Sequence, residues 1–402
     1  MEKRQKKLII PFIALLVLAI LITGIALLVK KYMPSSKEMS LDDYFKVSKG
    51  EMQVILQNQI YDTKALYDNG EIYVDFGLVH DSLNSRFYWD AKENQLLYTT
   101  STAVISAAVD SSDYYTNKSK SSMDYPIVKV SGDNAYVALD YVKQYTALDY
   151  KKYKNPDRVV ITYRYNEKAD FAKAKKKAKL RYRASIKSDI LVNLNEGDEV
   201  SVLEQGSESS SGDSSAASFD KVMSADGVVG YVRKKDIGKL YQSEYTTDFK
   251  EEQYSHILKD GKVNLVWHQV TTSAANDNVL NLLNATKGVN VVAPTWFTVS
   301  GNHGEITSLA SDTYVARARS LGVEVWGVCN DSKIGKVLGS TTTRQKLEKN
   351  LIAEAIKYSL DGINIDFEHV RKANGDDFIQ FIRELGIMCR NNGVVLSIDN
   401  YP

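Results

Sequence analysis

The clearest hydrophobic pattern in the chain is an uninterrupted apolar stretch near its start. Leu8 to Val29 contains no charged residue, and as a helix it would measure about 33 Å, enough to cross a bilayer. Basic residues precede the stretch, and Lys30 and Lys31 follow it without a small-residue cleavage site. The pattern predicts an uncleaved single-pass anchor at 8–29, a cytoplasmic tail at 1–7 and an extracellular body at the cell membrane. A buried core helix is the alternative, but the stretch has no polar face.

Residues 40–165 consist of short runs in which apolar and polar positions alternate, as at 71–77 and 95–99. Alternation of this kind is typical of half-buried strands. The order strand, short helix, strand, strand can be followed twice, first over 72–98 and again over 135–161. The segment is therefore predicted to be an α+β domain that acts as a stalk.

Residues 178–238 contain a closer series of short strands separated by turn residues, which predicts a small all-β barrel. The segment 206–218 is rich in serine, and we interpret it as a long loop inside this barrel rather than a linker between domains.

From residue 261 the pattern changes to strands that alternate with helices. Apolar runs begin at Lys262, Val289, Gly322, Gly362 and Val394, between 27 and 40 residues apart. That spacing is typical of βα units in a parallel barrel. Helical periodicity fills the gaps, with one helix expected after a cap at 340–343 and another capped by Asp376 and ending near Gly393.

A complete (βα)8 barrel takes about 250 residues, and 261–402 accounts for five of its strands. We therefore expect the N-terminal part of a barrel, cut after strand five, and expect 261–402 to be poorly soluble when expressed alone. The whole chain is predicted to be multidomain: transmembrane helix, α+β stalk, small β barrel and partial (β/α)8 barrel.

Composition narrows the possible chemistry. With 51 basic and 50 acidic residues the net charge is +1, which gives no electrostatic reason to expect a nucleic-acid partner. Five histidines and two cysteines show no zinc-ligand spacing, so we expect neither a metal nor a cofactor. Cys329 and Cys389 belong to separate βα units, and no disulfide is predicted between them.

The most informative segment is 361–368, Asp-Gly-Ile-Asn-Ile-Asp-Phe-Glu. Because side chains alternate along a strand, Asn364, Asp366 and Glu368 share one face, which we expect to point into the barrel. Burying two acids and an amide in a row is costly unless they form hydrogen bonds or do chemistry. Glu368 is at the carboxyl end of the strand, where barrel enzymes place their sites.

These residues resemble the D-G-x-D-x-D-x-E signature of glycoside hydrolase family 18, with Asn364 in place of the middle aspartate. The segments 292–297 and 394–398 resemble the spore-cortex and wall-hydrolase branch of that family. The resemblance implies that Glu368 is the general acid and base, and that Asp366 holds the substrate's 2-acetamido group while Asn364 and Asp361 support it. Hydrolysis would be retaining and substrate-assisted, so an N-acetylglucosamine glycan, peptidoglycan rather than chitin, is the expected partner.

The two preceding segments have resemblances of their own. Residues 40–165, with the turn Trp-Asp-Ala-Lys at 89–92, resemble the small N-terminal domain of copper amine oxidases, which carries no copper. Residues 178–238, with Leu-Arg-Tyr-Arg at 180–183 and Asp-Gly-Val-Val-Gly-Tyr-Val at 226–232, resemble the bacterial SH3 domain. That family tends to bind peptidoglycan stem peptides. Phe219 stands where the family usually has tryptophan.

Some side chains at predicted strand ends are candidates for substrate binding. We name four of them: Trp296, His268, Asn330 and Tyr401. Trp267, next to His268, is equally well placed. A packed position at the rim is the alternative for each. The competing hypothesis for the whole protein is a non-catalytic cell-wall or carbohydrate-binding protein that uses the small modules and holds glycan without cleaving it.

Overall fold

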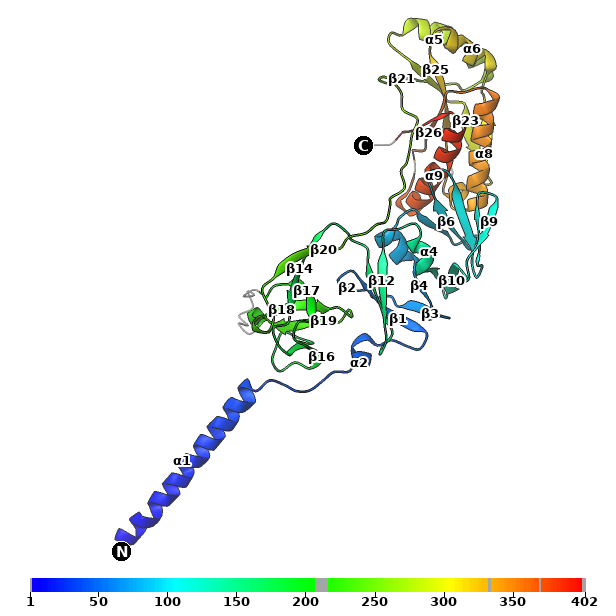
Figure 1. The fold of residues 1–402 in the computed structure, drawn as a ribbon. Coiled ribbons are helices and arrows are strands. Elements are labelled where there is room, and N and C mark those ends of the chain that lie inside the picture. Colours follow the sequence, from blue (N-terminus) through cyan, green and yellow to red (C-terminus); the bar gives the residue numbers. More distant parts are fainter. Residues whose placement is uncertain (1, 207–215, 332–333, 369, 400–402) are drawn as a thin grey trace. The chain divides into compact units, whose positions relative to one another are not determined.

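The computed structural model describes residues 2–206, 216–331, 334–368 and 370–399 (Figure 1). It is a mixed α/β structure with two compact units, one formed by Met1–Tyr67 with Ala147–Asp248 and the other by Asp68–Thr146 with Phe249–Pro402. The segment predicted as one stalk domain, 40–165, is therefore divided between the two units.

The first unit begins with α1, Glu2–Tyr32. Within the described residues, one helix is apolar and long enough to cross a membrane, over Leu15–Tyr32, and that window is 0% buried. The short helix α2, Leu41–Phe45, follows, with the Ser40 hydroxyl accepting from the Asp43 amide at 3.0 Å. Its Phe45 ring is buried.

A small mixed sheet in the first unit has the order β3-β1-β13-β12, with β2 paired to β1. The strands β1 and β13 are parallel, with Val54 opposite Val159. The bounds of these strands are β1 Glu51–Leu56, β2 Gln59–Ile60, β3 Ala65–Asp68, β12 Asp149–Tyr153 and β13 Arg158–Thr162.

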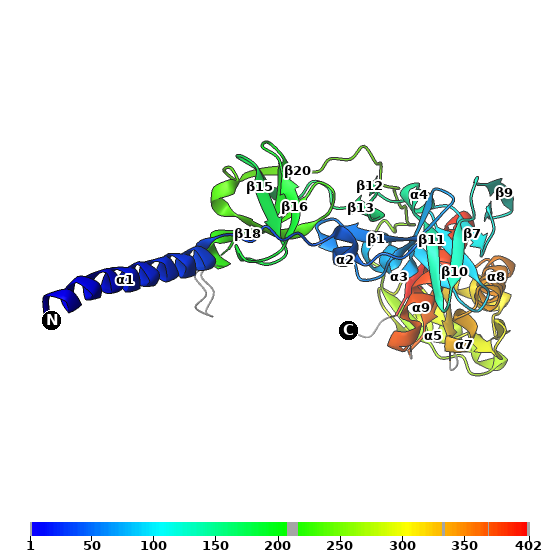
Figure 2. The same ribbon diagram turned by 90° about the horizontal axis from the view of Figure 1, so that it is seen from below.

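The other sheet of the first unit has seven strands in the order β16-β15-β19-β18-β17-β14-β20; Figure 2 shows β15 and β16 side by side. Every strand expected in 178–238 is present, and β14 and β20 add to the sheet from outside that range. Gly230 is required on β19, because a Cβ there would lie 2.6 Å from the Arg181 carbonyl oxygen. The strand bounds are β14 Lys168–Lys173, β15 Ala178–Arg181, β16 Ile190–Leu194, β17 Glu199–Glu204, β18 Phe219–Ser224, β19 Val229–Arg233 and β20 Tyr241–Glu244. Most of the serine-rich segment 206–218 lies outside the described residues.

The second unit contains two antiparallel groups of strands from its N-terminal segment. One is β10-β11-β4 and the other is the five-stranded sheet β5-β6-β7-β8-β9. Their bounds are β4 Glu71–Asp75, β5 Phe87–Asp90, β6 Gln95–Thr99, β7 Val104–Ala108, β8 Asp113–Thr116, β9 Ser119–Ser122, β10 Val128–Ser131 and β11 Asn134–Ala138. The helices α3, Phe76–Leu78, and α4, Leu139–Lys143, follow β4 and β11, as the predicted order of strand, short helix, strand, strand requires.

The C-terminal segment of the second unit contributes a parallel sheet in the order β21-β22-β25-β26-β27. These five strands confirm the five predicted runs. Their bounds are β21 Leu265–His268, β22 Val291–Pro294, β25 Glu324–Asn330, β26 Gly362–Asp366 and β27 Val395–Ile398. A hairpin that was not predicted, β23 Phe297–Ser300 with β24 Glu305–Ser308, pairs with the end of β25 through Phe297 and Cys329. A closed eight-stranded barrel is not present among the described residues.

Helices connect these parallel strands. They are α5 Val279–Ala285, α6 Asp312–Ser320, α7 Ile334–Leu338, α8 Thr341–Lys357 and α9 Gly375–Asn391. Apolar residues of α8 and α9, among them Leu351 and Leu385, are buried with Ile363 and Ile365 of β26 in one core. Cys329 and Cys389 are buried and free.

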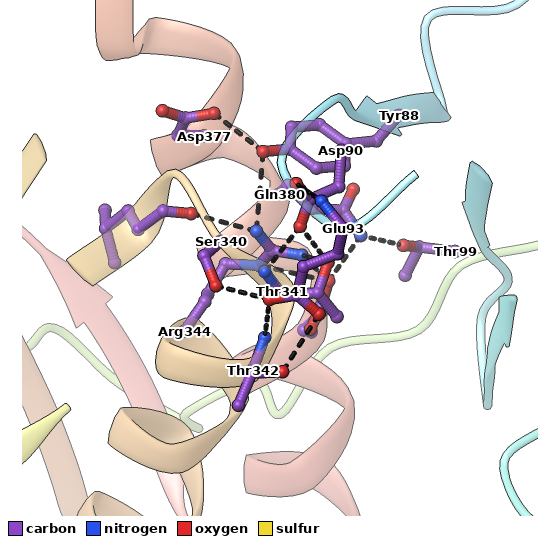
Figure 3. Close-up of polar contacts among 12 residues, drawn as sticks. Tyr88, Asp90, Glu93, Thr99, Ser340, Thr341, Thr342, Arg344, Asp377 and Gln380 are labelled. Atoms are coloured by element: carbon purple, nitrogen blue, oxygen red, sulfur yellow. Dashed lines mark hydrogen bonds and ion pairs between the residues drawn. The ribbon is translucent and has the colours of Figure 1, made fainter. Parts of the chain in front are cut away.

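The N-terminus of α8 is capped by the five-stranded sheet rather than by its own preceding residues. The Thr341 amide and hydroxyl donate to Asp90 Oδ2 at 2.6 and 2.7 Å, and the Thr342 amide donates to Glu93 at 2.8 Å (Figure 3). Ser340 is the N-cap residue but makes no side-chain capping bond. The cap predicted at 340–343 is therefore supplied by the last residue of β5, Asp90, and by Glu93 in the turn after it. Asp376 likewise lies inside the first turn of α9, whose N-cap is Asn374.

A buried polar network joins the same sheet to α8 and α9. The Arg344 side chain, 0% exposed, donates to Glu384 Oε1 at 3.0 Å and to the Leu338 carbonyl at 2.9 Å. Tyr88 donates to Asp377 at 2.7 Å, and Gln380 donates to Thr99 at 2.9 Å (Figure 3). The β5–β9 sheet is thus part of the packing around the parallel sheet's helices.

Candidate active site

The candidate site is built on β26, whose side chains alternate as the sequence predicts. Ile363 and Ile365 are 0% exposed, and Phe367 stacks on Phe381 of α9 with ring centroids 5.7 Å apart. The opposite face presents Asn364, which is buried, then Asp366, which is half-buried. The polar row therefore faces away from the helices.

Glu368 follows the end of β26 and is exposed. The sequence suggested that all three polar side chains of the row would be buried; the structure buries Asn364 and part of Asp366 only. An exposed carboxyl at the carboxyl end of a parallel strand is free to approach a ligand from solvent.

The register of the sheet continues the polar row onto both neighbouring strands. Asn330 of β25 is paired with Asp366, and Ser397 of β27 is paired with Asn364. One residue beyond β27, the Asp399 amide donates to the Ile365 carbonyl at 2.9 Å. Asn330, Asp366 and Asp399 are thus next to one another across three strands.

Asn364 is held from both sides. Its Nδ2 donates to Ser397 Oγ at 2.8 Å, and its Oδ1 accepts from the Trp267 indole N–H at 3.3 Å. These bonds account for the burial of an amide at 1% exposure. The Trp267 indole is 60% exposed, so its N–H is fixed beside the polar row while its ring remains open to solvent.

One layer toward the start of the strands, the same face is apolar. Trp326 is buried with Leu265, Val291 and Val395. Position 362, opposite this indole, has room only for glycine, because a Cβ there would lie 2.7 Å from the Trp326 ring. The polar side chains are therefore confined to the carboxyl ends of the strands.

Asp366 and Asp399 both have a raised pKa. Burial raises the pKa of Asp366 above 3.8, and the neighbouring Glu368 carboxylate raises it further. Burial also raises the pKa of Asp399; a hydrogen bond from Asn364 opposes this rise, and the charge of Asp366 adds to it. Both shifts keep a proton on the row to higher pH than an isolated aspartate would hold it.

Asp361 lies at the other end of β26, away from the polar row. Its Oδ2 accepts from the Val325 amide at 2.9 Å and its Oδ1 pairs with Arg319 at 2.9 Å. The carboxylate thus closes the start of β26 onto β25. Its support of Asp366, which the family resemblance implied, is indirect, through the position of the strand.

The four predicted binding residues are differently placed. Asn330 is in the row. His268 faces away from it, with Nδ1 2.9 Å from the Tyr314 hydroxyl and its ring stacked on Tyr314. Trp296 is 1% exposed and donates to Asn276 at 2.8 Å, so neither face of its indole is open to a sugar. Tyr401 lies outside the described residues.

Sequence reasoning missed Ser397 and Asp399. The signal was present, because the alternation that was used for 361–368 also runs through Val395, Ser397 and Asp399. Among the residues that the structure describes, no group of three His, Cys, Asp or Glu side chains is placed to hold a metal ion.

Part of the chain is similar to a known domain family. Residues 54–162 match the family model of the copper amine oxidase N-terminal domain, which confirms the resemblance stated for 40–165 over most of its length. A comparison with curated proteins found no match.

Solved structures similar to part of the chain are chitinases and spore cortex-lytic enzymes. A chitinase from Chromobacterium violaceum is 19% identical, over 34% of this chain and 45% of that one, with a TM-score of 0.30. The spore cortex-lytic enzyme SleL of Bacillus megaterium is 17% identical, over 35% of each chain, with a TM-score of 0.28. A chitinase from Bacteroides thetaiotaomicron is 14% identical, over 34% and 46%, with a TM-score of 0.29. This chain spans less than half the length of these structures.

Proposed function

We propose that this protein is a membrane-anchored, extracellular glycoside hydrolase that cleaves N-acetylglucosamine-containing glycan, peptidoglycan rather than chitin, with retention of configuration. The observation behind the proposal is the arrangement at the end of β26: an exposed carboxyl, Glu368, two residues beyond a half-buried carboxyl, Asp366, whose pKa is raised by burial. The 361–368 segment supports it further through its resemblance to glycoside hydrolase family 18.

The two carboxyl groups differ in environment, and this suits them to different roles. Asp366 accepts a hydrogen bond from the N–H of the substrate's 2-acetamido group, so that the acetamido carbonyl oxygen lies below the anomeric carbon. That oxygen forms a bond to the anomeric carbon while the bond to the glycosidic oxygen breaks, and Glu368 gives its proton to the leaving oxygen. Glu368 then removes a proton from water, whose oxygen attacks the anomeric carbon and reopens the acetamide.

Trp267 supplies a place for a sugar ring next to these carboxyl groups. Its indole is 60% exposed, and its N–H bond to Asn364 fixes the ring beside the row. Sugar faces carry C–H groups that pack on aromatic rings. The membrane anchor proposed for α1 would put the protein at the cell surface, which favours peptidoglycan as the glycan.

The proposal is tested by replacing the acid. The full chain, in detergent or membrane vesicles, is incubated with purified sacculi, and soluble reducing ends are measured. E368Q is expected to lose at least about 100-fold in turnover, since general acid catalysis contributes that much or more. E305Q, at a partly exposed glutamate of β24 that pairs with Lys346, is the control and should be unchanged. Equal release by E368Q and the wild type would contradict the proposal.

A non-catalytic wall-binding role is the second candidate, and a groove in the first unit favours it. Tyr44, Tyr182 and Tyr231 line this groove, which has a volume of about 470 Å³. Tyrosine rings are common in sites that bind sugars and peptides. Wild-type protein that remains bound to sacculi but releases no reducing ends would favour this role over hydrolysis.

A further inference from the structure

Asp399 lies in the candidate site although it is outside the 361–368 segment. Its amide bond to the Ile365 carbonyl continues the pairing of β27 with β26 by one residue. Ser397, two residues earlier on the same face, contacts Asn364. The Asp399 carboxyl therefore faces the polar row at the level of Asp366.

Only one of the two oxygens of this carboxyl has a hydrogen-bond donor among the described residues. Asn364 makes a hydrogen bond to it, but its Oδ2 is buried and has no hydrogen-bond partner among the described residues. A buried carboxyl oxygen without a donor is costly when it is ionised. A proton shared with the neighbouring Asp366 carboxyl would remove that cost.

Asn364, which precedes Asp366 on the same face of β26, cannot take this proton. Asn364 is an amide, and both ends of its side chain are engaged, by Trp267 and by Ser397. The carboxyl that faces Asp366 comes instead from the next strand.

We propose that Asp399 is a positioning residue of the site: it faces Asp366 across β26 and β27, shares one proton with it, and so orients the Asp366 carboxyl for the acetamido group. This inference rests on the proposed function. The proton balance is internal, because the O–H bond that breaks on one aspartate forms on the other. Two carboxyl groups at neighbouring positions of paired strands do not both ionise readily.

Among the described residues, one carboxyl outside the pair acts on its charge. It is Glu368, two residues past the end of β26, whose charge acts on Asp366. β25 presents Asn330 and β21 presents Trp267, neither of which titrates in this range, while His268 is on the opposite face against Tyr314. The charge of the pair is therefore set mainly by the three carboxyl groups.

The first test needs no activity. Infrared difference spectra of the full chain, recorded across the weakly acidic to neutral range, compare the protonated-carboxyl band of the wild type with D366N, D399N and D366N/D399N. Each single variant is expected to lose the same one protonated carboxyl, and the double variant to lose no more. If the double variant loses twice as much of the protonated-carboxyl band as either single variant, the two aspartates do not share one proton.

The second test separates positioning from a structural role by its pH profile. D399N is expected to lose about 10-fold in kcat with KM little changed, and its acid limb should move to lower pH because the Asp399 carboxyl no longer competes with Asp366 for ionisation. The exchange variant N364D/D399N returns a carboxyl to the other side of Asp366 and is expected to recover most of the activity. An unchanged rate and acid limb in D399N would overturn the proposal, as would a lowered melting temperature in D399N without any change in the pH profile of its activity.

Wild-type protein that cleaves no glycan would contradict the proposed function alone, since the infrared result is independent of turnover.

Discussion

At the scale of single residues, the site is governed by which polar side chains the strands can bury. Alternation along 361–368 was enough to predict that Asn364, Asp366 and Glu368 share a face, because that periodicity is a property of any strand. It could not predict that Glu368 would be exposed, since exposure depends on what surrounds the strand end. Asp399 was predictable in principle, but only by applying the same alternation of side chains to β27 and the residue after it.

A buried carboxyl pair between α8 and α9 leads to a prediction about stability. Glu348 and Glu384 are 2% and 1% exposed, and Arg344 bonds Glu384. Burial, and then the charge of Glu384, raise the pKa of Glu348 well above 4.5, although Arg344 opposes this. Because the folded-state pKa is the higher one, the stabilisation is complete below the unfolded value and is lost as pH rises through the folded-state pKa.

E348Q should therefore be more stable than the wild type at neutral pH, by about 1–2 kcal/mol, and indistinguishable from it in acid. The amide keeps the shape of the side chain and cannot ionise. Chemical unfolding at several pH values measures the difference, with E305Q as a control that should change stability by less than about 1 kcal/mol. A wild-type pH dependence retained in E348Q would show that Glu348 is not its source.

At the scale of elements, local patterns located the five parallel strands and the helices α8 and α9 but not what caps them. The cap of α8 comes from Asp90 and Glu93, which precede it by some 250 residues. Rules that use only neighbouring residues in the sequence cannot predict a capping partner so far away along the chain. The β23–β24 hairpin was missed for a different reason: its runs at 297–300 and 305–308 are short, and Gly301 and Gly304 take positive φ to close them.

The capping geometry predicts unequal effects of two neighbouring substitutions. D90A removes the acceptor of the Thr341 amide and hydroxyl, and should lower the free energy of unfolding of the second unit by about 1–3 kcal/mol. S340A removes a hydroxyl that donates to the Glu93 carboxylate but makes no bond to an α8 amide, and should cost less, about 0.5 kcal/mol. Denaturant titration of the full chain distinguishes them, and equal effects would mean that Asp90 does not cap the helix.

At the scale of the whole molecule, the order of modules followed from changes in periodicity along the chain, but their grouping did not. Residues 68–146 belong to the same compact unit as the parallel sheet, where Tyr88 and Thr99 meet α8 and α9 through Arg344 and Gln380. The part of the copper amine oxidase N-terminal match that lies within 68–146 therefore contributes to the packing of the proposed catalytic unit, beyond the role of a stalk.

The central claim is that hydrolysis uses the substrate's own acetamido group, held by Asp366, in place of an enzyme nucleophile. The most direct measurement compares release of reducing ends by the wild-type chain from intact peptidoglycan and from the same material after chemical de-N-acetylation. The account predicts release from the acetylated glycan and a loss of at least about 100-fold without the acetyl groups, with D366N equally impaired on the acetylated material. Equal cleavage of both glycans, or no cleavage of either, would contradict it.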